Sequence, residues 1–358
     1  MPLAKGRRMP QLEQLATRLD RLASIEASPF PVISLYLNLQ ADEHGKDRFE
    51  PFLRKELADR IRTYGTSSPE RRSLEQDADK IRRYVGNLEP SVNGLAVFAC
   101  AGAELFEAIP LAAPIDQHRL YVSSVPHLYP LAKILDGYPR YLALLTDTHS
   151  ARIFVFAANA VEKTGRVENA KTKHHKQGGW SQARYQRHNE NDQLLHAKEV
   201  VDTVARIVRD EKIDKIVLSG DEVIMPTLRE QLPKDVADRV VEIVKLDVKA
   251  PEHEVLASTI AALREKDAAG DRERVEQVIG AYRANALACV GVDAAMKAFE
   301  MGQVDELLMT STPDAFKDDT ADRLVAKARQ TSAKIRFIED PSLLAGVGDV
   351  AASLRFKI

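Results

Sequence analysis

Residues 141–156 have the sequence YLALLTDTHSARIFVF. Two apolar runs, 141–147 and 151–156, are joined by a short polar connection, which predicts a hairpin of buried strands. Further along, residues 194–208 repeat apolar side chains at helical spacing, and residues 215–220 form an apolar strand that ends at a glycine. Strands that alternate with helices in this order predict an α/β layer structure with parallel strands.

The regions on both sides of this stretch also alternate between helical and strand patterns. The first region predicts a helix, a strand, a helix pair and a strand hairpin, at residues 10–25, 32–39, 47–87 and 95–109. The last region predicts a small α/β/α sandwich whose final strand is 354–358, with Gly302 capping a helix at 292–301. The fold class is therefore α/β with three domains, which we expect at 1–136, 137–270 and 271–358, with a boundary in the charged stretch 265–271.

The composition excludes several classes of protein. A net charge of −2 over 358 residues rules out a uniformly basic nucleic-acid coat, so any RNA contact requires a local basic patch. Cys100 and Cys289 each lie in an apolar run, which predicts buried free thiols and a reducing compartment. No stretch approaches 18 apolar residues, and the N-terminus lacks the apolar core of a signal peptide. We therefore expect a cytoplasmic protein that does not bind membranes.

Residues 160–193 form an unusually long polar segment, and such a segment inside a compact domain is typically functional or disordered. Residues 171–188 within it read KTKHHKQGGWSQARYQRH, with three lysines, two arginines, three histidines and no acidic residue. Two adjacent glycines let a main chain approach a ligand closely, arginines bind phosphates, and aromatic rings stack on bases. The residues predicted to bind RNA are Lys171, Lys173, His174, His175, Lys176, Arg184, Tyr185 and Arg187. The alternative is a solvated surface loop with incidental charge.

Other chemistry is less well supported by the residue pattern. His174, His175 and His188 lack the spacing of a metal site, and no paired cysteine or carboxylate supports one. A nucleophilic pair of Ser181 and His188 lacks the strand-turn-helix context of a nucleophile elbow. The glycines also do not fit a phosphate-binding loop. We therefore expect no metal and no cofactor.

Two aspartates follow predicted strands. Asp147 and Asp221 suggest a metal-dependent nuclease, because carboxylates at strand ends hold metals in many α/β enzymes. The alternative is that each carboxylate stabilises a turn or a helix start, which is the commoner role.

The spacing around the two glycines resembles a known signature. Gly178-Gly179-Trp180-Ser181, followed by Arg184 and Arg187, is similar to the release loop of archaeo-eukaryotic peptide chain release factors. That loop contains Gly-Gly-Gln-Ser, with arginines four and seven positions after the glutamine. Trp180 occupies the glutamine position here, and Gln182 is the nearest glutamine. This departure is similar to bacterial members and to Vms-type ribosome quality-control hydrolases. Further similarity to the family lies at 92–98, 291–308, 346–348 and 354–356.

The resemblance implies a fold and an activity. It implies a ribonuclease H-like middle domain with a long basic loop, and a C-terminal domain resembling kink-turn-binding ribosomal proteins. It implies hydrolysis of the peptidyl-tRNA ester in the peptidyl transferase centre, with catalytic candidates Gly178, Gly179, Trp180, Ser181 and Gln182. The implied partners are the ribosome, through large-subunit RNA, the peptidyl-tRNA, and a GTPase or subunit-splitting protein.

The family's codon-reading motifs, Asn-Ile-Lys-Ser and Tyr-x-Cys, are missing from the first region, which favours rescue of stalled ribosomes over reading of stop codons. Two other functions stay open. One is a non-catalytic, Pelota-like adaptor, and the other is an RNA-binding protein outside translation.

Overall fold

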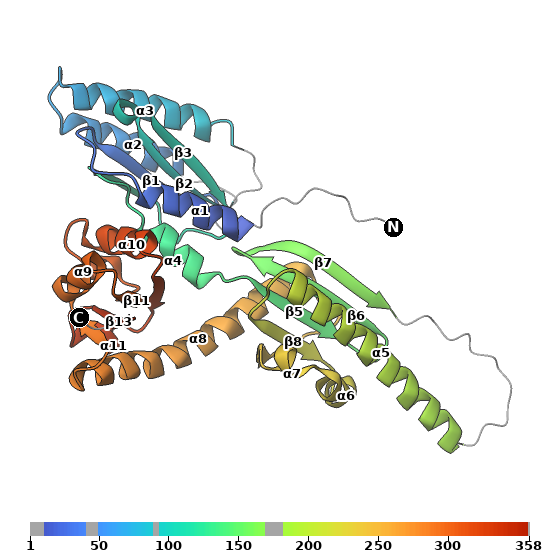
Figure 1. Cartoon of the computed structure of the whole chain (residues 1–358). Coiled ribbons are helices and arrows are strands. Elements are labelled where there is room, and N and C mark those ends of the chain that lie inside the picture. Colours follow the sequence, from blue (N-terminus) through green and yellow to red (C-terminus); the bar gives the residue numbers. More distant parts are fainter. Residues whose placement is uncertain (1–10, 41–48, 89–92, 169–181, 357–358) are drawn as a thin grey trace. The chain divides into compact units, whose positions relative to one another are not determined.

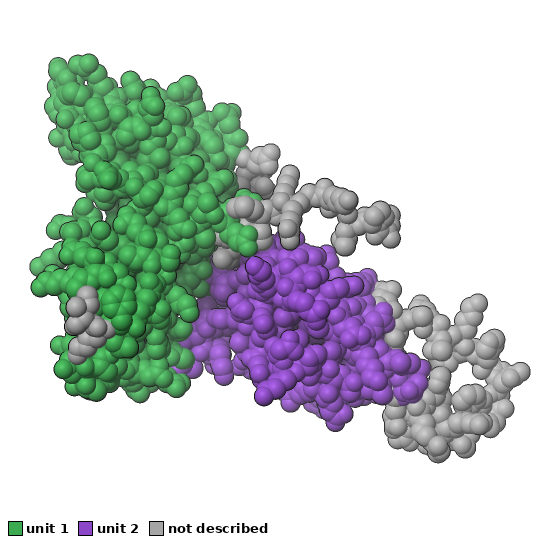
Figure 2. Space-filling view, in the orientation of Figure 1, with its two compact units in different colours: residues 1–137, 270–358 green, residues 138–269 purple. Residues whose placement is uncertain are grey.

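The computed structural model describes most of the chain in two compact units (Figures 1 and 2). The described residues are 11–40, 49–88, 93–168 and 182–356. Unit 1 comprises residues 1–137 and 270–358, and unit 2 comprises residues 138–269. The mixed α/β architecture with several sheets confirms the predicted class. The division into three domains stays a prediction.

The N-terminal part of unit 1 is built on an antiparallel sheet. Its elements are α1 (Gln11–Ala23), β1 (Val32–Asn38), α2 (Phe49–Arg62), α3 (Pro69–Val85), β2 (Gly94–Cys100), β3 (Leu105–Leu111) and β4 (Arg119–Ser123). The strand order is β3-β2-β1-β4, so β1 and β2 are central. Every residue of β2 is buried, which explains why its sequence is an unbroken apolar run. Leucines of α2 and α3, including Leu57 and Leu74, pack against one core with Leu35 of β1.

A buried carboxylate holds the turn between β2 and β3. The turn is the 3-10 helix η1 (Ala101–Ala103), and the Ala101 amide donates to Oδ2 of Asp77 on α3 at 3.0 Å. The Gly102 amide donates to the Ser73 hydroxyl at 2.9 Å, so α3 fixes the turn twice. Because the Asp77 side chain is buried, its pKa is raised from 3.8 to about 6, although the Ala101 amide partly offsets this rise.

The C-terminal part of unit 1 is a mixed sheet of order β10-β13-β11-β12. Its elements are β10 (Ala288–Val290), α9 (Val292–Glu300), β11 (Val304–Thr310), η2 (Pro313–Ala315), α10 (Thr320–Gln330), β12 (Lys334–Ile338), α11 (Ser342–Ala345) and β13 (Val350–Leu354). β11 is parallel to β12 and antiparallel to β13. Gly302 adopts φ +67° directly after α9, and its amide donates to the Phe299 carbonyl. This geometry confirms the predicted glycine cap.

A charged cluster joins this sheet to the C-terminal half of α8 (Glu252–Arg283). Glu306 of β11 is almost fully buried, and it accepts from Nε of Arg274 at 2.7 Å and from Nε of Arg336 at 3.2 Å. Asp271 of α8 pairs with the same Arg336 at 3.3 Å. The two guanidinium groups are about one-third exposed, so the cluster lies at the margin of the core.

A second buried carboxylate anchors α4 (Tyr129–Gly137) within unit 1. Oδ1 of Asp322 on α10 accepts from the amides of Leu128 and Tyr129 at 2.7 and 3.0 Å. The other oxygen of Asp322 contacts the ring of His127, whose amide donates to the Ser34 hydroxyl on β1. The segment before α4 is therefore held by both β1 and α10.

Unit 2 is a five-stranded sheet of order β7-β6-β5-β8-β9. Its elements are β5 (Tyr141–Thr146), β6 (Ser150–Ala157), β7 (Ala160–Glu168), α5 (Gln182–Asp210), β8 (Ile216–Gly220), α6 (Ile224–Gln231), α7 (Lys234–Ala237), β9 (Val240–Ile243) and the first half of α8. β5 pairs antiparallel with β6, which confirms the predicted hairpin, and it pairs parallel with β8. β8 is parallel to β9.

Both faces of the unit 2 sheet are covered. On one face, Leu142 and Leu144 of β5 pack with valines of α5 and with Leu228 of α6. On the other face, Tyr141, Ala143 and Leu145 pack with Val255 and Leu263 of α8. Successive side chains of a strand point to opposite faces, so a strand buried on both faces is apolar throughout. This explains the sequence of β5.

Two predicted element boundaries are wrong. Part of the polar segment 160–193 is regular structure, because β7 occupies 160–168 and α5 begins at Gln182. The stretch 265–271, where a boundary was predicted, lies inside the continuous helix α8, and the two compact units divide there, between Ala269 and Gly270. The last strand, predicted at 354–358, is instead β13, which ends at Leu354, and Phe356 is exposed.

Replacing Asp77 with asparagine tests the buried carboxylate. The pKa of the Asp77 carboxyl is about 6 in the folded state and 3.8 in the unfolded chain. The protonated carboxyl therefore stabilises unit 1 fully below pH 3.8, and this stabilisation is lost as pH rises through 6. The neutral amide keeps an acceptor for the Ala101 amide, so we expect Asp77→Asn to be more stable than wild type by roughly 2–3 kcal/mol above pH 7. We expect the two to be similar near pH 4. Urea unfolding of both proteins at the two pH values measures this, and a pH-independent difference would contradict it.

The Glu306 cluster gives a second prediction. Glu306→Ala leaves two partly buried guanidinium groups without their shared carboxylate, and we expect it to lower the free energy of unfolding by about 2 kcal/mol. Asp59 forms a solvent-exposed pair with Arg62, so Asp59→Ala is the matched control and should change stability by less than about 0.5 kcal/mol. Equal effects in the two variants would show that burial does not strengthen the cluster.

Candidate functional site

The carboxyl ends of the parallel strands β5 and β8 define one edge of the unit 2 sheet. Thr146 at the end of β5 pairs with Gly220 at the end of β8. Glu168, the last residue of β7, pairs with Ser150 next to the β5–β6 turn, so β7 ends at the same edge. We call the side of the sheet at which β5 and β8 end the carboxyl edge, which differs from the outermost, or edge, strands. Ligands of open α/β sheets bind outside the carboxyl ends of the strands.

Helix α5 reaches beyond this edge. Its C-terminal end is fixed at the opposite edge, where Arg140, directly before β5, pairs with the Glu211 carboxylate at 2.7 Å. Its 29 residues give a length of about 44 Å, whereas the six residues of β5 span only about 20 Å. The N-terminal part of α5 therefore extends past the carboxyl edge (Figure 1).

The burial pattern along α5 agrees with this extension. Ala197, Val200, Val201, Val204 and Val208 are buried on the sheet. In contrast, residues 191–195 include no buried side chain. The first buried side chain described on α5 is that of His196.

The structure locates only some of the predicted site residues. Gln182, Arg184, Tyr185 and Arg187 lie in the first two turns of α5, ahead of its packed part. Nothing is described of their side chains. The remaining predicted residues lie outside the described residues; they are Lys171, Lys173, His174, His175, Lys176, Gly178, Gly179, Trp180 and Ser181. All of them fall between the end of β7 and the start of α5.

The two strand-end aspartates stabilise backbone turns. Asp147 Oδ1 accepts from the amides of His149 and Ser150, each at 2.7 Å, and from the Ser150 hydroxyl. Asp221 Oδ1 accepts from the amides of Val223, directly before α6, and of Ile224, the first residue of α6. Both carboxylates therefore have the turn and helix-start roles that were the alternative to a nuclease site.

Metal ligands do not gather within the described ranges. There, no group of three histidine, cysteine, aspartate or glutamate side chains could hold a metal ion. Of the three histidines considered in the sequence, His174 and His175 lie outside these ranges, and nothing is described of the His188 side chain, so that hypothesis stays untested.

Sequence reasoning missed His196, which lies at the carboxyl edge. It is fully buried, and burial lowers the pKa of its ring, while the Ser150 backbone and the Asp147 carboxylate partly offset this shift. The signal was present in the sequence, because position 196 continues the apolar stripe of Val200 and Val204 toward the N-terminus. A histidine in such a stripe indicates an unusual buried polar group.

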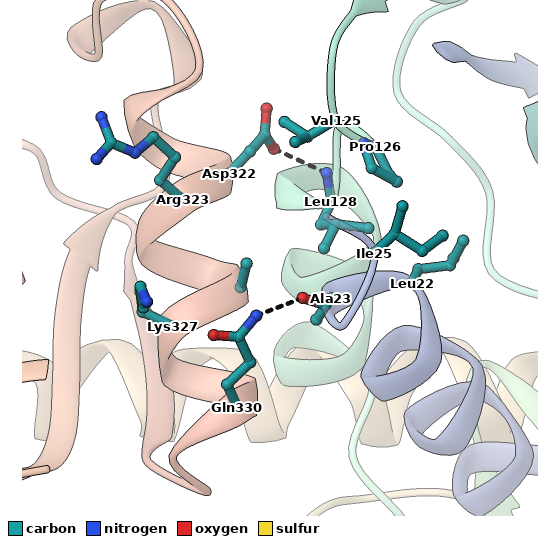
Figure 3. A pocket seen from close by; sticks show the side chains of 11 residues that line it. Leu22, Ala23, Ile25, Val125, Pro126, Leu128, Asp322, Arg323, Lys327 and Gln330 are labelled. Carbon is teal, nitrogen blue, oxygen red and sulfur yellow. Dashed lines mark hydrogen bonds between the residues drawn. The ribbon is translucent and has the colours of Figure 1, made fainter. Parts of the chain in front are cut away.

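Unit 1 contains a cavity of about 160 Å³ between α10, the end of α1 and the segment before α4 (Figure 3). Leu22, Ile25 and Leu128 line one side, and Gln330 donates to the Ala23 carbonyl across it. Asp322 at its edge is occupied by the α4 amides. The carboxylate therefore serves the fold, and the cavity offers no chemistry comparable to the carboxyl edge of unit 2.

Unit 2 is thus an α/β unit covered on both faces, in which β7 and the long helix α5 flank one polar, glycine-containing segment of the sequence. Residues 126–264 match the family described as "Bacterial archaeo-eukaryotic release factor family 10". This match covers the middle part of the chain, and it agrees with the resemblance found in the sequence. A comparison with curated proteins finds no match.

Among solved structures, the chain is similar to three translation factors at low identity. The model of ribosome-bound archaeal Pelota and ABCE1 shares 14% identity over 99% of this chain and 96% of that chain, with a TM-score of 0.44. Dom34 of S. cerevisiae shares 12% over 74% and 79%, with a TM-score of 0.42. The archaeal translation termination factor aRF1 shares 16% over 96% and 98%, with a TM-score of 0.29. These values are too low to transfer an activity.

In the part of the chain that the structure describes, no helix is both long and apolar enough to cross a membrane.

The capping role of Asp221 yields a test. We expect Asp221→Ala to lower the free energy of unfolding by about 1 kcal/mol, because two amides at the start of α6, those of Val223 and Ile224, lose their acceptor, and Asp221→Asn to retain most of the stability. Thermal unfolding with and without 5 mM Mg²⁺ or Mn²⁺ distinguishes this from a metal site. Stabilisation of the wild type by either metal that disappears in Asp221→Asn would contradict the capping role.

Proposed function

We propose that this protein is a ribosome-associated release or rescue factor that hydrolyses the peptidyl-tRNA ester through the segment Gly178–Gln182. The observation that carries the proposal is the family match, because residues 126–264 contain the whole segment between β7 and α5. The Gly-Gly pair and the two arginines in family register lie within the same range.

The geometry of unit 2 supports this proposal. β7 and α5 both meet the carboxyl edge, and the first two turns of α5 extend away from the packed core. A segment attached to such a helix can enter a narrow RNA-walled site while the sheet stays outside it. The chain around the segment is cationic, which suits a site lined by phosphates.

The proposed chemistry depends on the main chain. Ester hydrolysis needs a positioned water molecule and donors for the developing oxyanion. Gly178 and Gly179 would permit the turn, and the amide at Trp180 or Gln182 would donate to the reacting oxygen, with Ser181 between them. The Gln182 side chain would orient water or exclude other nucleophiles. No metal or cofactor enters this scheme.

The cationic residues would hold RNA. Arg184 and Arg187 are three positions apart, which is about one turn of α5, and each would bind phosphate. The residues proposed to add cationic or stacking contacts are Lys171, Lys173, His174, His175, Lys176 and Tyr185. The proposed partners are large-subunit RNA, peptidyl-tRNA and a GTPase or subunit-splitting protein, all in the cytoplasm.

The finer fold assignment belongs to the same proposal. We propose an N-terminal domain at 1–136, a ribonuclease H-like middle domain at 137–270 that carries the basic segment, and a C-terminal domain at 271–358. The last would resemble kink-turn-binding ribosomal proteins. The sheet orders of the two units are compatible with this division.

One observation favours a second function. Trp180 stands where the family signature has glutamine, so the chain is also a candidate for a Pelota-like adaptor that binds stalled ribosomes without hydrolysis. An RNA-binding role outside translation is the third alternative. Both alternatives predict an intact ester after binding.

We predict that Gly179→Ala lowers the rate of peptide release from stalled ribosomes at least about 100-fold, because a side chain would obstruct the turn that presents the amide. Gln182→Ala should lower it about tenfold or more. The assay measures labelled peptide freed from ribosomes carrying peptidyl-tRNA. Gly280→Ala on α8 is the matched control, since its added Cβ meets no atom within 4 Å.

Wild-type rates in both Gly179→Ala and Gln182→Ala would defeat the catalytic proposal. Sedimentation with ribosomes separates the alternatives. An adaptor cosediments at moderate salt without releasing peptide, whereas an RNA-binding protein outside translation does not cosediment. Phosphate contacts weaken as salt rises, so the measurement includes a salt series.

A further inference from the structure

A cluster of charged side chains lies at the side of the unit 2 sheet opposite the carboxyl edge. Arg140, directly before β5, donates from Nε to the Glu162 carboxylate of β7 at 2.8 Å and from Nη2 to the Glu211 carboxylate at 2.7 Å. Its Nη1 donates to the main-chain carbonyl of Glu211. Lys163 of β7 donates to the second carboxylate oxygen of Glu211 at 2.7 Å. We call these four residues the Arg140 cluster.

The Arg140 cluster is largely buried. The side chains of Arg140, Glu162 and Glu211 are 18%, 10% and 25% exposed. Hydrogen bonds from Lys163 and Arg140 lower the pKa of the Glu211 carboxyl, and burial offsets only part of this shift. The hydrogen bonds of a planar guanidinium group fix the direction of its partners as well as their distance. The cluster therefore holds its members in one geometry and does more than balance their charges.

The Arg140 cluster joins the two elements on either side of the polar segment. Two of its members lie at the start of β7, and Glu211 directly follows α5. The Glu211 amide still donates to the Ile207 carbonyl at 2.9 Å, whereas its own carbonyl accepts from Arg140. Carbonyls at the end of a helix lack partners within the helix and carry the negative end of its dipole, so a guanidinium group is favourable there. β7 and α5 are thus joined at the ends that lie away from the carboxyl edge.

This junction affects the far end of α5 because the helix is long. The valines of α5 that pack on the sheet lie around Val204. Along the helix axis, Glu211 lies about 10 Å from Val204, whereas Arg187 lies about 26 Å from it in the other direction. A rotation about the packed valines that moves Glu211 by about 1 Å therefore moves Arg187 by roughly 2.5 Å. A misplacement of about 1 Å at a catalytic site can lower a rate about 100-fold.

We propose that Arg140 is a positioning residue for the proposed release reaction, because it sets the direction in which α5 presents Gln182, Arg184 and Arg187. The guanidinium group binds β7 and the end of α5 at the same time, so it holds the helix against rotation about its packed valines. The direction of the first two turns of α5 thus depends on a side chain at the opposite side of the sheet. This inference rests on the proposed function.

Two substitutions of Arg140 test the role. Arg140→Met keeps an aliphatic side chain and removes every donor. It should lower the unfolding midpoint by about 3 °C or more, and at saturating protein it should release labelled peptide from stalled ribosomes at least about tenfold more slowly. Arg140→Lys keeps the charge, but one ammonium group does not reproduce the fork of donors. It should stay within about 2 °C of the wild-type midpoint and still release peptide at least about threefold more slowly.

Arg152 of β6 provides the matched control for lost stability. It donates to the carbonyls of Val248 and Ala250, and its guanidinium group lies 4.8 Å from the centre of the Phe154 ring. Phe154 and Ala250 belong to the core on the sheet face away from α5. Arg152→Met should therefore lower the unfolding midpoint by a similar amount and release peptide within about twofold of wild type.

A distance measurement reports the direction of α5 without a release assay. Spin labels are placed at two exposed positions, Asn191 on α5 and Glu222 between β8 and α6, in a chain whose native cysteines are replaced by alanine. The distribution of distances between the labels should broaden or shift by about 2 Å in Arg140→Met, because the helix is free to rotate about its packed valines. In Arg152→Met it should match the wild type.

Three outcomes decide the matter. Equal release rates in Arg140→Met and Arg152→Met, at an equal loss of stability, would show that Arg140 only stabilises unit 2. A wild-type distance distribution in Arg140→Met would reject the positioning of α5, whatever the release rates. If the wild type itself releases no peptide, the proposed function fails, and the label distances alone then show whether Arg140 holds the helix.

Discussion

The burial of one aliphatic stripe of α5 on the unit 2 sheet is the constraint on which the site depends. Val200, Val201, Val204 and Val208 pack with Leu142 and Leu144, and this contact aligns the C-terminal half of the helix with the strands. Because α5 is more than twice as long as β5, the alignment also forces the other half beyond the carboxyl edge. Residues 182–187 therefore lie on a helix outside the core.

The polar groups at the carboxyl edge serve the fold. Asp147 and Asp221 accept backbone amides there. The proposed reaction draws instead on the segment between β7 and α5, because it needs main-chain donors and surrounding RNA.

Elements buried on both faces could be predicted from the sequence, because their apolar runs are long and their turns are polar. The hairpin at 141–156 and the strand at 216–220 are examples. β7 could not be predicted, because it is an edge strand with few apolar residues. The charged stretch 265–271 lies inside α8, where the two compact units divide between Ala269 and Gly270. The spacing of the glycines and arginines gave the resemblance with which the match over residues 126–264 agrees.

The central claim is that the segment delivered by α5 reaches the ester that joins a nascent peptide to its tRNA. The most direct measurement incubates the wild-type protein with ribosomes that carry labelled peptidyl-tRNA, with and without a codon in the A site, and scores free peptide. The account predicts release in both cases, with an empty A site no slower than an occupied one. Ribosomes that bind the protein and retain the intact ester in both cases would contradict it.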